Sequence, residues 1–201
     1  MNKHKPAIIP FTVALLMLFA ASTYGLEACD HPAIGRYEGS SIIHQESSDY
    51  DRYRLGVSAA DDGTVAETLA VEGKVLMTLY SGPEDASAFE VFTGYRKLLQ
   101  SNRFEILFSC EKSACGGQFL GAFYDLAPFA NDPGWNNSAP ITRGNSDASY
   151  VLVAKSDSEG KTMYVSIRTR QKDLELVQSS TTSASLPVNG PSLGYPGTGA
   201  P

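Results

Sequence analysis

Residues 86–115 read A-S-A-F-E-V-F-T-G-Y-R-K-L-L-Q-S-N-R-F-E-I-L-F-S-C-E-K-S-A-C, and this stretch decides the fold. Ser87 and Glu90 have the spacing of a capping box, in which the serine hydroxyl accepts from an amide of the first helical turn. Apolar residues then recur at steps of three and four and form one stripe: Ala88, Val91, Phe92, Tyr95, Leu98 and Leu99. The pattern predicts a helix over residues 86–101 that packs on a sheet.

The second half of the stretch predicts a strand. Asn102 suits the left-handed position that follows a helix. Residues 103–109 then alternate between apolar and polar side chains, which is typical of a half-buried strand. Gly94 interrupts the helix at a cost of about 1 kcal/mol relative to alanine. Either a close contact with the sheet or a tolerated defect explains it. Core packing explains the aromatic stripe better than a ligand groove.

The first 25 residues have the features of a secretory signal. A basic start precedes an apolar run over residues 7–21, and small residues precede a cleavage point after Gly25. A run of about 15 residues is short for a membrane span. We therefore predict an exported, periplasmic protein, with outer-membrane association or an uncleaved anchor as alternatives.

The charge of the exported chain excludes some partners. Without Lys3 and Lys5 it has 16 − 2 = 14 basic residues against 22 acidic ones, a net charge of −8. An acidic chain of this kind is a poor ligand for nucleic acid or for anionic lipid. We predict no nucleic-acid partner and no cofactor.

Three cysteines remain in the exported chain. Cys110 and Cys115 predict a disulfide in an oxidising compartment, which would stabilise the fold by about 2 kcal/mol. A metal site is not predicted, because there is no second cysteine pair and the exported chain has only His31 and His44 as histidines. A redox site is not predicted either, because the spacing is not C-x-x-C.

Cys29 is the cysteine left over once Cys110 and Cys115 are paired. The sequence Leu26-Glu27-Ala28-Cys29 resembles a lipoprotein processing site, with a leucine at −3 and a small residue at −1. Acylation of Cys29 would tether a soluble domain to the membrane. Whether Cys29 is acylated, free or paired stays open, and a membrane partner is expected only if it is acylated.

The rest of the chain is rich in strand patterns. Residues 41–45 and 50–55 predict two strands, and residues 65–80 predict either a hairpin or one long strand bent at Gly73. Residues 118–127 fit a short helix or a strand. The clearest hairpin joins two runs around a Ser-Asp-Ser-Glu-Gly turn: residues 150–154 and 162–169.

A long irregular loop at residues 128–147 holds the only tryptophan, Trp135. Long loops often carry binding residues, so Phe129 and Trp135 form a candidate binding lip. The alternative, which we favour, is that they cover the sheet edge. From about Gln178 the chain becomes rich in Ser, Thr, Gly and Pro, which predicts a disordered tail over residues 178–201.

These patterns together predict one α+β domain over residues 26–177, after a signal over residues 1–25. We expect a mostly antiparallel sheet with one principal helix, about 86–101, packed on one face. A domain of about 150 residues buries enough surface to be stable alone.

Several short motifs occur in an order that resembles a known family. They are Asp30-His31-Pro32, Arg36-Tyr37-x-Gly39-Ser40, Leu69 to Tyr80 with Gly73-Lys74-Val75, Phe89-Glu90-Val91 to Tyr95, Phe104 to Phe108, and Cys110 to Cys115-Gly116. They resemble an uncharacterised domain family of exported proteins of Gram-negative bacteria. The resemblance implies a domain directly after a signal peptide, often ahead of an OmpA-like peptidoglycan-binding module. We expect no such module here, and the family offers no catalytic residues.

The function predicted from these observations is that of a non-enzymatic accessory protein of the cell envelope. It would bind another periplasmic or outer-membrane component, either a protein or a glycan. The alternatives are a lipoprotein tether acylated at Cys29 and a periplasmic hydrolase. The hydrolase would have to use His31 or His44 with a serine and an aspartate, such as Asp30 or Asp49, and the sequence has no G-x-S-x-G, H-E-x-x-H or phosphate-loop motif.

Overall fold

A computed structural model describes residues 30–129, 132–133, 149–158, 160–170 and 175–184. Its body is a six-stranded antiparallel sheet in the order β1-β4-β8-β7-β6-β5. The prediction of a mostly antiparallel sheet with one main helix is therefore confirmed. The sheet strands are β1 Ser41–Gly56, β4 Thr68–Ser81, β5 Glu105–Glu111, β6 Ser149–Ser158, β7 Lys161–Arg170 and β8 Glu175–Ala184. The remaining elements are β2 Ala60–Asp61, β3 Thr64–Val65, α1 Ala88–Ser101, the 3-10 turn Lys112–Cys115 and α2 Phe119–Tyr124.

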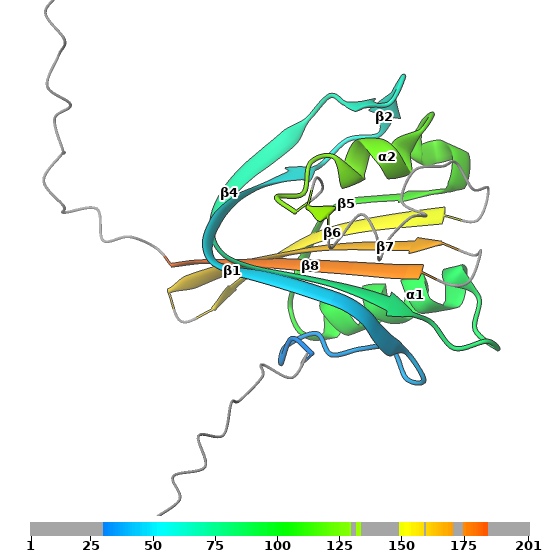
Figure 1. Cartoon of the computed structure of the whole chain (residues 1–201), viewed down its shortest axis with the longest axis horizontal. Coiled ribbons are helices and arrows are strands. Elements are labelled where there is room, and N and C mark those ends of the chain that lie inside the picture. The colour runs from blue at the N-terminus through cyan, green and yellow to red at the C-terminus, as the bar shows by residue number, and fades with distance from the viewer. Residues whose placement is uncertain (1–29, 130–131, 134–148, 159, 171–174, 185–201) are drawn as a thin grey trace, which may run out of the picture.

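Both faces of the sheet are covered, as Figure 1 shows. Helix α1 packs on one face, which we call the α1 face; its buried sheet residues include Tyr80, Leu152 and Ile167. Helix α2 and the β2–β3 hairpin cover the opposite α2 face, with Met77 and Val151 among its buried residues. The prediction of a helix on one face is right for α1, but the second face is buried as well.

Helix α1 begins where the sequence predicts. The Ser87 hydroxyl accepts from the Glu90 amide at 3.1 Å and caps the first turn. At Gly94 the neighbour is the arm and not the sheet: a Cβ added there would lie 3.1 Å from the ring of Tyr37, which would have to shift by a few tenths of an ångström. The prediction for Asn102 is wrong. Its φ is −87°, and the left-handed residue is the next one, Arg103, at +63°.

Strands β1 and β4 form one long, bent hairpin. The two strands predicted within residues 41–55 are a single strand of 16 residues, interrupted by a register shift between Ser48 and Asp51. Strand β4 is one strand bent at Gly73, whose φ of +152° disfavours other residues. The first part of β4, residues 68–73, pairs with β1 and not with β8. This part curls towards α2 (Figure 1).

The end of the domain lies further along the chain than predicted. We expected a tail from residue 178, but residues 178–184 belong to β8, which pairs with β4 on one side and β7 on the other. The expected boundary at 177 is therefore wrong: β8 closes the centre of the sheet. Residues 1–25 and 185–201, for which we predicted a signal and a tail, lie outside the described residues.

Two further predictions are settled by the described elements. The β6–β7 hairpin, predicted from residues 150–154 and 162–169, is confirmed with a continuous antiparallel register. Residues 118–127, which fitted either a helix or a strand, contain helix α2.

Candidate functional site

The disulfide is the one predicted pair of site residues that the structure brings together. Cys110 and Cys115 are bonded, and their Cα atoms are 5.0 Å apart. The bond links the end of β5 to the 3-10 turn ahead of α2, and the Cys115 side chain is fully buried. Phe129 packs, partly buried, against the core of the α2 face. Cys29 and Trp135 lie outside the described residues.

The two candidate histidines are both engaged in local contacts. The Nδ1 atom of His31 accepts from the Ala33 amide at 3.2 Å in a tight turn, and burial lowers its pKa. His44 lies on β1, where its Nε2 atom is 2.7 Å from the Glu46 carboxylate. The histidines therefore sit on different elements, and each ring is held by a neighbour in sequence.

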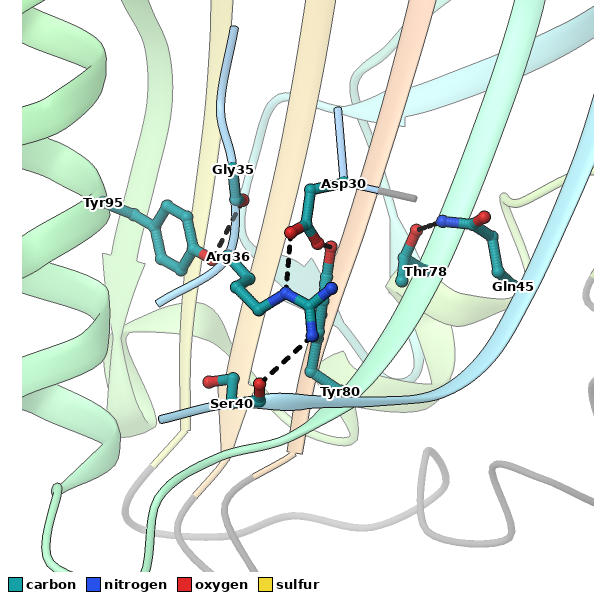
Figure 2. Close-up of polar contacts among 8 residues, drawn as sticks. All are labelled: Asp30, Gly35, Arg36, Ser40, Gln45, Thr78, Tyr80 and Tyr95. Carbon is teal, nitrogen blue, oxygen red and sulfur yellow. Dashed lines mark hydrogen bonds and ion pairs between the residues drawn. The ribbon is translucent and has the colours of Figure 1, made fainter. Parts of the chain in front are cut away.

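An ordered arm, residues 30–40, precedes the sheet and is attached to it by a partly exposed polar cluster (Figure 2). The Asp30 carboxylate accepts from Arg36 Nε at 2.6 Å and from the Tyr80 hydroxyl at 3.0 Å. Arg36 Nη1 also donates to the Ser40 carbonyl at 3.4 Å. These bonds fold the arm back on itself and attach it to β4.

Two tyrosines, Tyr80 of β4 and Tyr95 of α1, bond the arm to the rest of the domain. The Tyr95 hydroxyl donates to the Gly35 carbonyl at 3.5 Å (Figure 2). Ile34 of the arm packs into the core of the α1 face, with 4% of its surface exposed. Burial raises the pKa of Tyr80, and the neighbouring Asp30 adds to the shift. Burial likewise raises the pKa of Tyr95. Both phenols therefore stay neutral donors in the physiological range.

A groove opens between this arm and the outer side of α1. Its volume is about 340 Å³, and its lining residues are Tyr37, Phe89, Glu90, Thr93, Gly94 and Lys97. Tyr37 leans over the helix because Gly94 has no side chain to block it. Its hydroxyl donates to the Glu90 carboxylate at 3.2 Å, which fixes one wall of the groove.

Aromatic rings connect the groove to the core. Phe92 stacks on Tyr150 with ring centroids 5.1 Å apart, and Phe89 lies 5.7 Å from the same Tyr150 ring. Phe92 and Tyr150 are buried, whereas half of the Phe89 surface is exposed. The row of rings runs from the core to Phe89 at the surface.

The groove combines an apolar wall with two opposite charges, those of Glu90 and Lys97. Such a surface can stack on a sugar ring or receive an apolar side chain, while the charged groups orient the ligand. The sequence contained a signal for this site: Phe89 is an aromatic residue that lies outside the helical stripe of α1. Tyr37 gave no such signal, because only the folded arm brings it to the helix.

The comparisons with known proteins add no relative. No protein-family model matches the chain, and no curated protein was found to be similar to it. Within the described ranges, no cluster of His, Cys, Asp or Glu side chains has the arrangement of a metal site. None of the described helices has the length and apolar character needed to cross a membrane.

Proposed function

We propose that this chain is an exported accessory protein of the cell envelope that binds a periplasmic or outer-membrane component, a protein or a glycan, through the groove between the arm and α1. The observation that carries the proposal is Phe89. A half-exposed aromatic ring that lies against Tyr150, beside Glu90 and Lys97 in a groove, suits an anchor for a partner.

The proposed location in the cell envelope rests on other observations. The signal-like first 25 residues and the resemblance to exported domains favour the envelope, and the Cys110–Cys115 disulfide fits an oxidising compartment. His31 and His44 lie on different elements, and each ring contacts a residue two positions along the chain, which favours a binding role over a hydrolase that uses both.

Site-specific crosslinking in cells of the native host tests the proposal. A photo-crosslinking phenylalanine derivative replaces Phe89, which keeps an aromatic ring in the groove. The matched control places the same derivative at Lys161, an exposed residue at the far end of the β6–β7 hairpin. We expect a discrete crosslinked product at position 89 and none at position 161.

The identity of the product then separates the two classes of partner. A product that carries protein is separated from one that carries cell-wall glycan by digestion with a protease or with a glycan hydrolase. Products of equal yield at both positions, or no product at position 89, contradict a partner in the groove. An intact mass of the exported protein, taken in parallel, detects acyl chains on Cys29 and so tests the tether alternative.

A further inference from the structure

Two aromatic rings, Tyr37 of the arm and Phe89 of α1, line the groove. The Tyr37 ring lies over Gly94, and half of the Phe89 surface is exposed. The face of an aromatic ring attracts a cation, and pockets for ammonium and guanidinium groups are built from such rings. A ligand with an apolar stem and a positive charge at its tip suits walls of this kind.

The Glu90 carboxylate lies in the same groove and is only partly engaged. Its Oε1 atom accepts from the Tyr37 hydroxyl at 3.2 Å. Among the described residues, its Oε2 atom has no hydrogen bond or ion pair. A carboxylate can take two parallel N–H donors from one guanidinium. Glu90 can therefore accept further donors from a partner.

Negative charge prevails at the Glu90 end of the groove. Burial raises the pKa of the Tyr37 phenol, and the negative charges of Glu90, Asp85 and Glu38 raise it further. The positive end of the α1 dipole is worth about half a charge, which is less than the charge of these three carboxylates. Lys97, the basic lining residue, lies two turns of helix beyond Glu90, a separation of about 10 Å. At physiological salt this exceeds the screening length of about 8 Å.

We propose that the partner is a protein that inserts an arginine side chain into the groove, an assignment that rests on the proposed function. Its methylene groups would lie against the rings of Phe89 and Tyr37, and its guanidinium would donate to Glu90. Arginine suits the site better than lysine, because its planar head stacks on aromatic rings and is more weakly hydrated.

The size and the charge of the groove both favour this occupant. Its volume of about 340 Å³ is near the lower end of ligand pockets, which span about 300–1,000 Å³, and a single side chain needs no more. One sugar ring also fits this volume. A neutral sugar gains nothing from the excess of negative charge, whereas a guanidinium does, and this complementarity decides between them.

The test follows the backbone amide resonances of the purified exported protein by nuclear magnetic resonance. The probe is an acetylated and amidated alanine–arginine–alanine peptide. Its matched control carries citrulline, which has nearly the shape of arginine without the charge. We expect the amides of Phe89, Thr93 and Gly94 to shift with a saturable profile. The citrulline peptide should bind about tenfold more weakly, because it lacks the ion pair and the cation–ring contact.

Two substitutions on α1 form a matched pair. Glu90→Gln removes the charge and keeps a residue that suits the capping box, so the helix should stay formed. It should weaken binding of the arginine peptide about tenfold. Lys97→Gln removes a distant like charge and should leave the Kd unchanged or lower it by up to about twofold. If Lys97→Gln weakens binding and Glu90→Gln does not, the groove binds an anion and the proposal is wrong.

Chitobiose, a neutral disaccharide, separates the two classes of partner. Groove resonances that shift with chitobiose and not with the arginine peptide overturn the proposal in favour of a glycan. Equal binding of the arginine and citrulline peptides also overturns it, as does the absence of any shift up to about 10 mM arginine peptide.

The arginine site and the proposed function fail in different ways. A crosslinked product at position 89 without binding of the arginine peptide contradicts the arginine site alone. Binding of the arginine peptide without any crosslinked product supports the cation site and contradicts the partner in the cell envelope.

Discussion

The two faces of the sheet bury their polar groups in different ways. On the α1 face, the Thr169 hydroxyl donates to the Ala88 carbonyl at 3.1 Å and the Tyr80 hydroxyl donates to Asp30 at 3.0 Å. On the α2 face, the Thr181 hydroxyl and the Nε–Nη2 edge of Arg168 are buried with no hydrogen-bond partner among the described residues.

The difference concerns individual side chains and not whole faces, because the buried Ser40 hydroxyl of the arm, on the α1 side, also has no hydrogen-bond partner among the described residues. A buried polar group without a partner costs free energy, so proteins keep few of them. The α1 side carries the candidate groove. Four predictions test this comparison.

The largest expected effect is a loss of stability from distorting the loop at Gly116, which leads into α2. Gly116 has a φ of +93°, and a Cβ added there would lie 1.7 Å from the Ala60 carbonyl oxygen of the bridge between these residues. Gly116→Ala should lower the free energy of unfolding by about 3 kcal/mol, measured by urea denaturation.

The matched control is the next residue. A Cβ at Gly117 would meet nothing within 4 Å, so Gly117→Ala should change the free energy of unfolding by less than about 0.5 kcal/mol. Equal effects of the two substitutions would mean that the Ala60 contact does not limit this loop.

The disulfide should matter next. It closes a short loop beside the α2 face, and the Cys110→Ala, Cys115→Ala double variant should lose about 2 kcal/mol. Reducing the unaltered protein should produce the same loss, and reduction of the double variant should produce none. A further loss on reducing the double variant would show that another disulfide contributes to stability.

Two threonines on opposite faces give the sharpest comparison. Each is 1% exposed. Thr169→Val removes the hydrogen bond to the Ala88 carbonyl and should cost about 1 kcal/mol. Thr181→Val removes a hydroxyl that has no hydrogen-bond partner among the described residues, and should leave stability unchanged or raise it by about 1 kcal/mol. Equal losses in both variants, measured by thermal unfolding, would break the distinction between the two side chains.

The smallest expected effect is a fall of stability at alkaline pH, which arises from Tyr80 on the α1 face. Burial raises the pKa of Tyr80 above its ordinary value of 10. Above about pH 10 the unfolded chain therefore releases a phenol proton that the folded chain keeps, and stability falls as the pH rises. In Tyr80→Phe, the free energy of unfolding, taken relative to the variant's own value at pH 8, should fall less steeply with rising pH between pH 9 and about pH 11. An unchanged slope would mean that Tyr80 does not carry this dependence.

Much of the fold could be predicted from the sequence, because periodicity reports local structure. The capped helix α1, the β6–β7 hairpin and the disulfide each follow from residues close together in the chain. The prediction failed at β8, whose Ser- and Thr-rich sequence has few apolar anchors. Those residues form a strand because β4 and β7 offer hydrogen-bonding edges on both sides, which is a non-local property.

Burial was harder to predict for the same reason. The sequence predicts a strand over residues 162–169, and the prediction does not extend to the burial of Arg168. Helix α2 covers the side of β7 that carries Ser166 and Arg168, which are 3% and 4% exposed. Alternation identifies two sides of a strand, but it cannot say that both are buried.

By itself, the sequence determined the local elements, the cysteine pair and the acidic character of the chain, because these depend on neighbouring residues and on composition. Tertiary structure alone decided which residues line the groove and which are buried. It placed Tyr37 over Gly94 to form the groove beside Phe89, and it enclosed Arg168 beneath α2. The physical reason is that burial and hydrogen-bond partnership are set by segments distant in sequence, which only the folded chain brings together.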